Sequence, residues 1–124
     1  MLQTFVIASG GAFGALMRFW VSSATYAMFG RAFPYGTLMV NVAGSLLMGF
    51  LFIWLTERSA LSPEWRSLIL VGFLGAFTTF STFSIETFNL LQGGEVSKAF
   101  INIFLSVVLC LLATWIGVAA GRQL

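Results

Sequence analysis

The chain has 124 residues, of which 59% are hydrophobic and only 8% carry a charge. A soluble domain carries about 25% charged residues, so this composition excludes a water-soluble globular domain and indicates that lipid is the solvent. The net charge of +2 comes from a handful of arginines and lysines and gives no reason to expect nucleic-acid binding. The chain has no histidine and no nucleophile–base pair, which argues against an enzyme.

Four long apolar stretches predict an all-α membrane protein with a single domain over residues 1–124. A helix needs about 20 apolar residues to cross a bilayer. Backbone polar groups in lipid must be satisfied within the protein, and the stretches lack the alternation of barrel strands, so helix is expected. The expected helices cover about 2–29, 34–56, 63–92 and 97–121.

The first expected helix carries two features, a pair of glycines and an arginine. Gly10 and Gly14 have the four-residue spacing that lets another helix approach closely, and simple packing is the favoured interpretation. Arg18 costs about 2.5–3.5 kcal/mol inside a membrane helix. Two interpretations stay open: its side chain reaches the nearer surface, or it lies at a pore entrance and concentrates anions there.

The second expected helix contains an amide within an apolar run. Asn41 must find a hydrogen-bond partner in lipid, either across a helix interface, where it stabilises packing, or as an N–H donor to an anion. Thr37 is expected to cap the start of this helix. The segment Ser62-Pro63-Glu64 predicts the start of the third helix, with proline at its first position.

The third helix holds the most unusual stretch, GFLGAFTTFSTFSIETFN over residues 72–89. Its glycines and threonines weaken a helix, so a break is expected near 75–79. Such a break survives at membrane depth only where protein or a cavity buries it. We therefore predict that this interrupted span lines a path for a small ion.

The aromatic residues of this stretch suggest that the ion is an anion. Phe77, Phe80 and Phe83 are three residues apart and lie on one side of a helix. A phenyl ring has a positive edge, so an anion can meet ring edges without meeting a full charge. Glu86 follows, either at the membrane interface or within the path; the sequence leaves both open.

The fourth helix supplies a polar line in an apolar segment, with one polar residue at every fourth position: Asn102, Ser106, Cys110 and Thr114. This line is either a hydrogen-bonded seam between helices or a polar track along a pore wall. We favour the track, because it gives the polar run of the third helix something to face. Cys110 is the only cysteine, which excludes a disulfide within the chain.

Three segments in this order and spacing, GGAFGALMR, GTLMVNVAG and GFLGAFTTFSTFSIE, resemble the bacterial fluoride channel family (Fluc, also called CrcB). The resemblance covers essentially the whole chain. It implies passive fluoride export across the bacterial inner membrane, and hence fluoride resistance. It also implies an antiparallel, dual-topology homodimer of four-helix subunits, with two pores and a structural sodium ion at the dimer centre.

The resemblance further implies roles for individual residues. The sodium ion would be held by the backbone carbonyls of Gly75 and Thr78. Cys110 departs from the hydroxyl more usual in such a track, and a thiol is a weaker donor. The residues implied along the fluoride path are Asn41, Phe80, Ser81, Thr82, Phe83, Ser106, Cys110 and Thr114. Arg18 is added to this path because of its charge, as the candidate cation at the pore entrance.

The cations are distributed evenly between the two membrane sides predicted from four crossings. One side holds Arg58, Arg66 and Arg122; the other holds Arg31 and Lys98, joined by Arg18 if that side chain reaches the surface. A chain with almost no positive-inside bias can insert both ways, as an antiparallel homodimer requires.

Two alternatives belong to other classes. A small multidrug-type, proton-coupled exporter also has four short helices with little charge bias, but it needs a carboxylate in its first helix, where this chain has only Arg18. A non-transporting membrane assembly subunit would explain the glycines but not the two facing polar lines.

Overall fold

The computed structural model describes residues 1–124 and contains helices only. Four helical stretches are long and apolar enough to cross a membrane: Leu2–Phe29, Tyr35–Arg58, Pro63–Gln92 and Val96–Gln123. This confirms the prediction of an all-α protein with four candidate membrane spans. The individual elements are α1 (Leu2–Phe29), α2 (Tyr35–Ile53), the π-helical η1 (Trp54–Arg58), α3 (Pro63–Arg66), the π-helical η2 (Ser67–Leu74), α4 (Gly75–Phe77), α5 (Phe80–Gln92) and α6 (Val96–Gln123).

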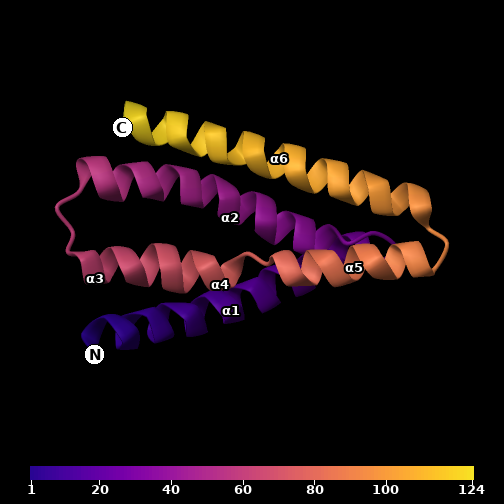
Figure 1. The fold of residues 1–124 in the computed structure, drawn as a ribbon, viewed down its shortest axis with the longest axis horizontal. Coiled ribbons are helices and arrows are strands. Elements are labelled where there is room, and N and C mark those ends of the chain that lie inside the picture. Colours follow the sequence, from indigo (N-terminus) through magenta and orange to yellow (C-terminus); the bar gives the residue numbers. More distant parts are fainter.

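The four spans run up and down, side by side (Figure 1). Both termini and the connection between η1 and α3 lie at one end, and the α1–α2 loop and the α5–α6 turn lie at the other. Contacts at each end fit this topology: Arg58 donates a hydrogen bond to the Arg122 carbonyl at the first end. At the second end, Lys98 Nζ donates to the Ala32 carbonyl over 3.3 Å.

Two helix starts test the capping predictions. The third span begins at Pro63 with Ser62 at the N-cap, as expected. The expectation for Thr37 is wrong, because α2 begins at Tyr35 with Pro34 at its N-cap, and Thr37 therefore lies inside the first turn. The Thr37 hydroxyl instead lies 3.4 Å from the hydroxyl of Tyr26 on α1.

Glycines bring two pairs of spans into close contact. A Cβ atom added at Gly10 would clash with the Leu68 carbonyl oxygen, and one added at Gly14 would clash with that of Phe73, so α1 lies directly against η2. In the same way, a Cβ at Gly49 or Gly117 would clash with a backbone carbonyl oxygen of the facing helix, so α2 lies directly against α6. The packing role predicted for Gly10 and Gly14 is confirmed.

The helical backbone of the third span is interrupted at two threonines. Thr78 has φ −88° and ψ 162°, and Thr79 has φ −154° and ψ 120°, so both are extended between α4 and α5. β-Branched side chains favour this conformation. Thr79 caps α5, because its Oγ1 accepts a hydrogen bond from the Thr82 N–H over 3.1 Å. The extended pair lies within the range 75–79 that the sequence singled out.

We expect Gly14→Val to destabilise the protein by roughly 1–3 kcal/mol, because the branched side chain would force α1 away from the Phe73 carbonyl. Thermal unfolding of the detergent-solubilised protein measures this. Gly11→Ala is the matched control, since a Cβ there meets its nearest atom at an ordinary 3.8 Å. Equal stability of both variants would contradict the close contact of α1 with η2.

Candidate functional site

The site is built around a two-point hydrogen bond at the interruption. Asn41 Nδ2 donates to the Thr79 carbonyl over 2.9 Å, and the Thr79 N–H donates to Asn41 Oδ1 over 2.7 Å. The side chain on α2 thus gives the Thr79 N–H the partner that it lacks in the helix, and adds a second donor to the Thr79 carbonyl. This is the interhelical partner that the sequence required for Asn41. An amide nitrogen carries two hydrogens, so one N–H of Asn41 is free for a further acceptor.

Arg18 also binds at the interruption. Its Nε donates to the Ala76 carbonyl over 3.1 Å, and the side chain is half-buried. Carbonyls in the last turn of a helix have no helical donor and carry the negative end of the helix dipole, which favours a cation there. The guanidinium therefore lies against the end of α4, a position that neither sequence interpretation specified.

The Gly75 and Thr78 carbonyls lose their helical donors here as well. In an unbroken helix the Thr79 N–H would bind the Gly75 carbonyl, but it binds Asn41 instead. Likewise the Thr82 N–H, which would bind the Thr78 carbonyl, binds Thr79 Oγ1. No group of three or more His, Cys, Asp or Glu side chains that could hold a metal ion is found in this chain.

A cavity of about 260 Å³ adjoins the interruption, and we call it the phenylalanine pocket. It brings together five residues of the path that the resemblance implied, from α2, α5 and α6. The Phe80 and Phe83 rings lie with their centroids 5.3 Å apart and tilted by 44°. Phe80 is 78% exposed, so the pocket lies at the surface of the chain. Its lining residues are Asn41, Phe80, Phe83, Ser106, Val107, Cys110 and Leu111.

Four other residues expected on the path do not line this pocket. Ser81 and Thr82 lie in the first turn of α5, where Ser81 Oγ is 3.4 Å from Thr79 Oγ1. Thr114 lies further along α6 and donates to the Ser45 carbonyl of α2 over 3.4 Å. Arg18 lies on the α1 side of the interruption, against Ala76.

Behind the pocket lies a polar cluster whose role the sequence left open. Asn102 is 1% exposed, and its Nδ2 donates to Thr87 Oγ1 over 2.9 Å. Thr87 Oγ1 in turn donates to the Phe83 carbonyl over 2.7 Å, and Ser106 Oγ donates to Asn102 Oδ1 over 3.4 Å. Along the polar line of α6, therefore, Asn102 and Thr114 form interhelical hydrogen bonds, while Ser106 and Cys110 line the pocket.

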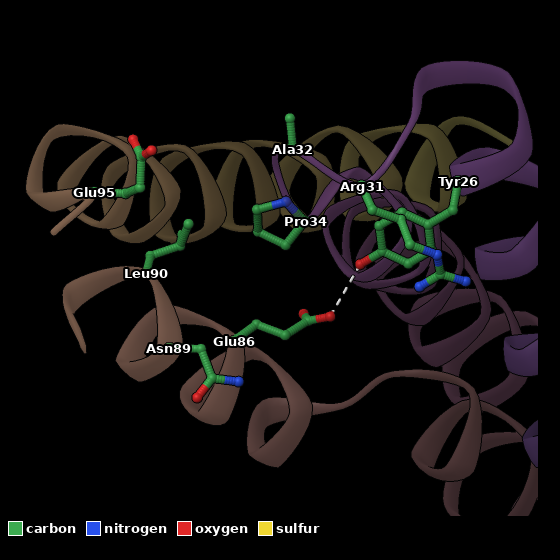
Figure 2. A pocket seen from close by; sticks show the side chains of 8 residues that line it. All are labelled: Tyr26, Arg31, Ala32, Pro34, Glu86, Asn89, Leu90 and Glu95. Carbon is green, nitrogen blue, oxygen red and sulfur yellow. Dashed lines mark hydrogen bonds between the residues drawn. The ribbon is translucent and has the colours of Figure 1, made fainter. Parts of the chain in front are cut away.

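A second cavity, of about 240 Å³, lies near the α1–α2 loop, and we call it the loop pocket (Figure 2). Glu86 points toward Tyr26 there, and the Tyr26 hydroxyl donates to Glu86 Oε2 over 3.0 Å. The other oxygen, Oε1, is buried and has no hydrogen-bond partner. The Arg31 guanidinium lies 4.5 Å from the centre of the Tyr26 ring. Glu86 thus faces α1 rather than the phenylalanine pocket.

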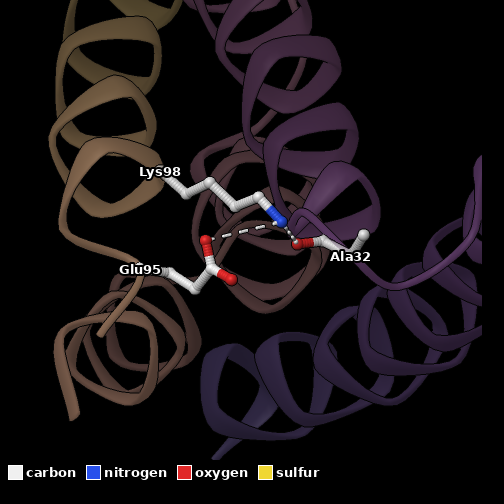
Figure 3. Close-up of polar contacts among 3 residues, drawn as sticks. All are labelled: Ala32, Glu95 and Lys98. Atoms are coloured by element: carbon white, nitrogen blue, oxygen red, sulfur yellow. Dashed lines mark hydrogen bonds and ion pairs between the residues drawn. The ribbon is translucent and has the colours of Figure 1, made fainter. Parts of the chain in front are cut away.

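Lys98 ties the two connections at this end together (Figure 3). Its Nζ lies 3.8 Å from Glu95 Oε2 and donates to the Ala32 carbonyl of the α1–α2 loop. Both partners are exposed, so the ion pair itself contributes little to stability. Its position links α6 to the loop that borders the loop pocket.

Comparison with known proteins identifies the family. The family model for CrcB-like protein, Camphor Resistance (CrcB), matches residues 5–118. The chain belongs to the CrcB family. A relative from Methylococcus capsulatus, named fluoride-specific ion channel FluC, is 57% identical over 123 residues, which is 99% of this chain and 54% of that protein. This CrcB-family chain therefore spans about half the length of that relative.

Two further relatives carry the same name. One from Coxiella burnetii is 50% identical over 99% of this chain and 100% of that protein. One from Magnetococcus marinus is 52% identical over 98% of each. The family resemblance read from the sequence is confirmed, and this CrcB-family chain is a multi-pass bacterial membrane protein. Its relatives are named as channels, in agreement with the expectation that it is not an enzyme.

We expect Asn41→Leu to destabilise the third span, because it leaves the Thr79 N–H without a partner and removes one of the hydrogen bonds to the Thr79 carbonyl. Each buried group left unsatisfied costs about 1–3 kcal/mol. Hydrogen–deuterium exchange over residues 75–82 and thermal unfolding measure the effect. Asn89→Leu, an exposed amide on α5, is the matched control. Unchanged exchange in Asn41→Leu would show that this pair does not hold the interruption.

Proposed function

We propose that this chain forms a fluoride-selective channel that passes fluoride out of the cell, down its gradient, across the bacterial inner membrane. The observation that carries the proposal is the phenylalanine pocket. It joins two phenyl rings to amide, hydroxyl and thiol groups beside an interruption in a membrane span. The names of the relatives support fluoride as the transported ion.

The chemistry of the pocket suits a small, strongly hydrated anion. The free N–H of Asn41 and the hydroxyl of Ser106 can replace part of a lost hydration shell, and the positive edges of Phe80 and Phe83 add weak attraction. No arginine or lysine lines the pocket, so the ion meets no full positive charge that would retain it. Conduction needs binding strong enough for entry and weak enough for release.

The remaining path residues extend the pocket in this proposal. Ser81 and Thr82 follow Phe80 directly on α5, and Thr114 lies one turn beyond Cys110 on the same face of α6. Arg18 places a positive charge beside the interruption, which would raise the local anion concentration without lining the pocket.

The channel is proposed to be an antiparallel homodimer with two pores. Support comes from Phe80, whose ring is 78% exposed beside polar pocket residues. A second copy would cover this open side and close the path. The three cations Arg58, Arg66 and Arg122 at one end face two, Arg31 and Lys98, at the other, which fits insertion in both orientations.

A structural sodium ion between the two copies fits the interruption. The Gly75 and Thr78 carbonyls, which have lost their helical donors, would be its ligands. Unwound backbone carbonyls are typical sodium ligands in broken membrane helices. Two carbonyls per chain would give four oxygens from two copies. A bound ion supplies positive charge that offsets the negative ends of these carbonyl dipoles.

We expect the reconstituted protein to release fluoride from liposomes when a fluoride gradient is the only driving force, and largely to retain chloride, because a narrow lining of donors and ring edges favours the smaller ion. A fluoride electrode and a chloride electrode measure the two fluxes, with protein-free liposomes as the control. Fluoride movement that requires a proton gradient would favour an exporter instead.

We expect Phe80→Leu and Phe83→Leu each to lower fluoride flux by about fivefold, because a ring-edge contact worth roughly 1 kcal/mol is lost from the path. Phe104→Leu, an exposed ring on α6 that lines neither pocket, is the matched control. Elution volume on size exclusion checks the assembly. Unchanged flux in both pocket variants would remove these rings from the path.

A further inference from the structure

Helix α5 is held in place differently from the other spans. Glycines bring α1 against η2 and α2 against α6, but α5 contains no glycine. Three polar contacts hold it instead: Asn41 binds Thr79 at its start, Asn102 binds Thr87 in its middle, and Tyr26 binds Glu86. The place of α5, and of the rings it carries, therefore depends on hydrogen bonds.

The middle contact has a direction that its own hydrogen bonds determine. The Thr87 hydroxyl has one hydrogen, which it donates to the Phe83 carbonyl. Its oxygen must then accept from Asn102, so the amide nitrogen of Asn102 faces Thr87. The amide oxygen consequently faces Ser106, which donates to it. The hydrogen-bond network thus determines which terminal atom of the Asn102 amide is the nitrogen and which is the oxygen.

The network joins two pocket residues through one that does not touch the pocket. Phe83 and Ser106 line the phenylalanine pocket from α5 and α6, whereas Asn102 does not. Asn102 reaches Phe83 through Thr87 and reaches Ser106 directly. Since the Ser106 hydrogen points to Asn102, Ser106 turns its lone pairs to the pocket. The Ser106 hydroxyl can donate to an anion only if it gives up this long, 3.4 Å hydrogen bond to Asn102.

We propose that Asn102 is a positioning residue of the phenylalanine pocket: its buried amide sets the place of Phe83 through Thr87 and the direction of the Ser106 hydroxyl. The consequence for ion flux rests on the proposed channel function, whereas the geometric statement does not. The hydrogen bond to Asn102 would make donation from Ser106 to fluoride reversible, because the Ser106 hydroxyl donates to Asn102 again when the ion leaves.

The test uses the full-length protein with Asn102→Leu, Thr87→Val and the double variant. Asn102→Leu should lower fluoride flux per channel by about tenfold, since it removes both links. Thr87→Val should lower it less, and the double variant should match Asn102→Leu, because the two changes break one chain. Gln3→Leu is the matched control, since it removes a 3.0 Å amide-to-hydroxyl bond to Ser67 far from the pocket.

A second measurement reads the pocket directly. Cys110 lines the pocket and is the only cysteine of the chain, so its labelling rate with methyl methanethiosulfonate reports on the local geometry. Asn102→Leu should change this rate severalfold in folded protein selected by size exclusion, and Gln3→Leu should not. If Asn102→Leu yields too little protein, the milder Thr87→Val tests the same link to Phe83.

The outcomes separate this proposal from the channel function. If Asn102→Leu and Thr87→Val match Gln3→Leu in flux per channel and in Cys110 labelling, and lower only the yield of folded protein, Asn102 has a purely structural role and the proposal is overturned. If the unaltered protein passes no fluoride, the proposed channel function fails by itself. Cys110 labelling then decides alone whether Asn102 positions the pocket.

Discussion

The structure depends on one constraint: backbone polar groups inside a membrane must have partners. Where the chain is extended within a span, some backbone groups lose their helical partners, and in lipid each group left unsatisfied costs several kcal/mol. Asn41 accepts a hydrogen bond from the Thr79 N–H and also donates one to the Thr79 carbonyl. Arg18, on α1, donates a hydrogen bond to the Ala76 carbonyl. These bonds make the interruption compatible with a bilayer, and the interruption gives α5 its own start beside α6.

The two halves of the third span are held by different forces. The half before the interruption lies against α1, where glycines leave no space between backbones. The half after it is fixed through polar side chains on α1, α2 and α6. A hydrogen bond can be exchanged with an ion or with water. The polar half is the one that carries the pocket.

The sequence predicted the features that depend on local chemistry. Hydropathy located four spans, Pro63 marked the start of the third, and the threonines indicated where its helix weakens. The sequence required a partner for Asn41 but could not name Thr79, because that contact depends on how α2 crosses the third span. The partners of Arg18 and Glu86 were hidden for the same reason. Thr37 was misassigned because Pro34, three residues earlier, already occupies the N-cap.

The exposed ring of Phe80 has a consequence for how such a protein is made. In the single chain the phenylalanine pocket lies at the surface, because Phe80 is 78% exposed. If a second copy completes the path, as proposed, a newly inserted chain contains no continuous water-filled route. Ion leakage during biosynthesis would then be prevented by geometry alone, since conduction and assembly would arise in the same step.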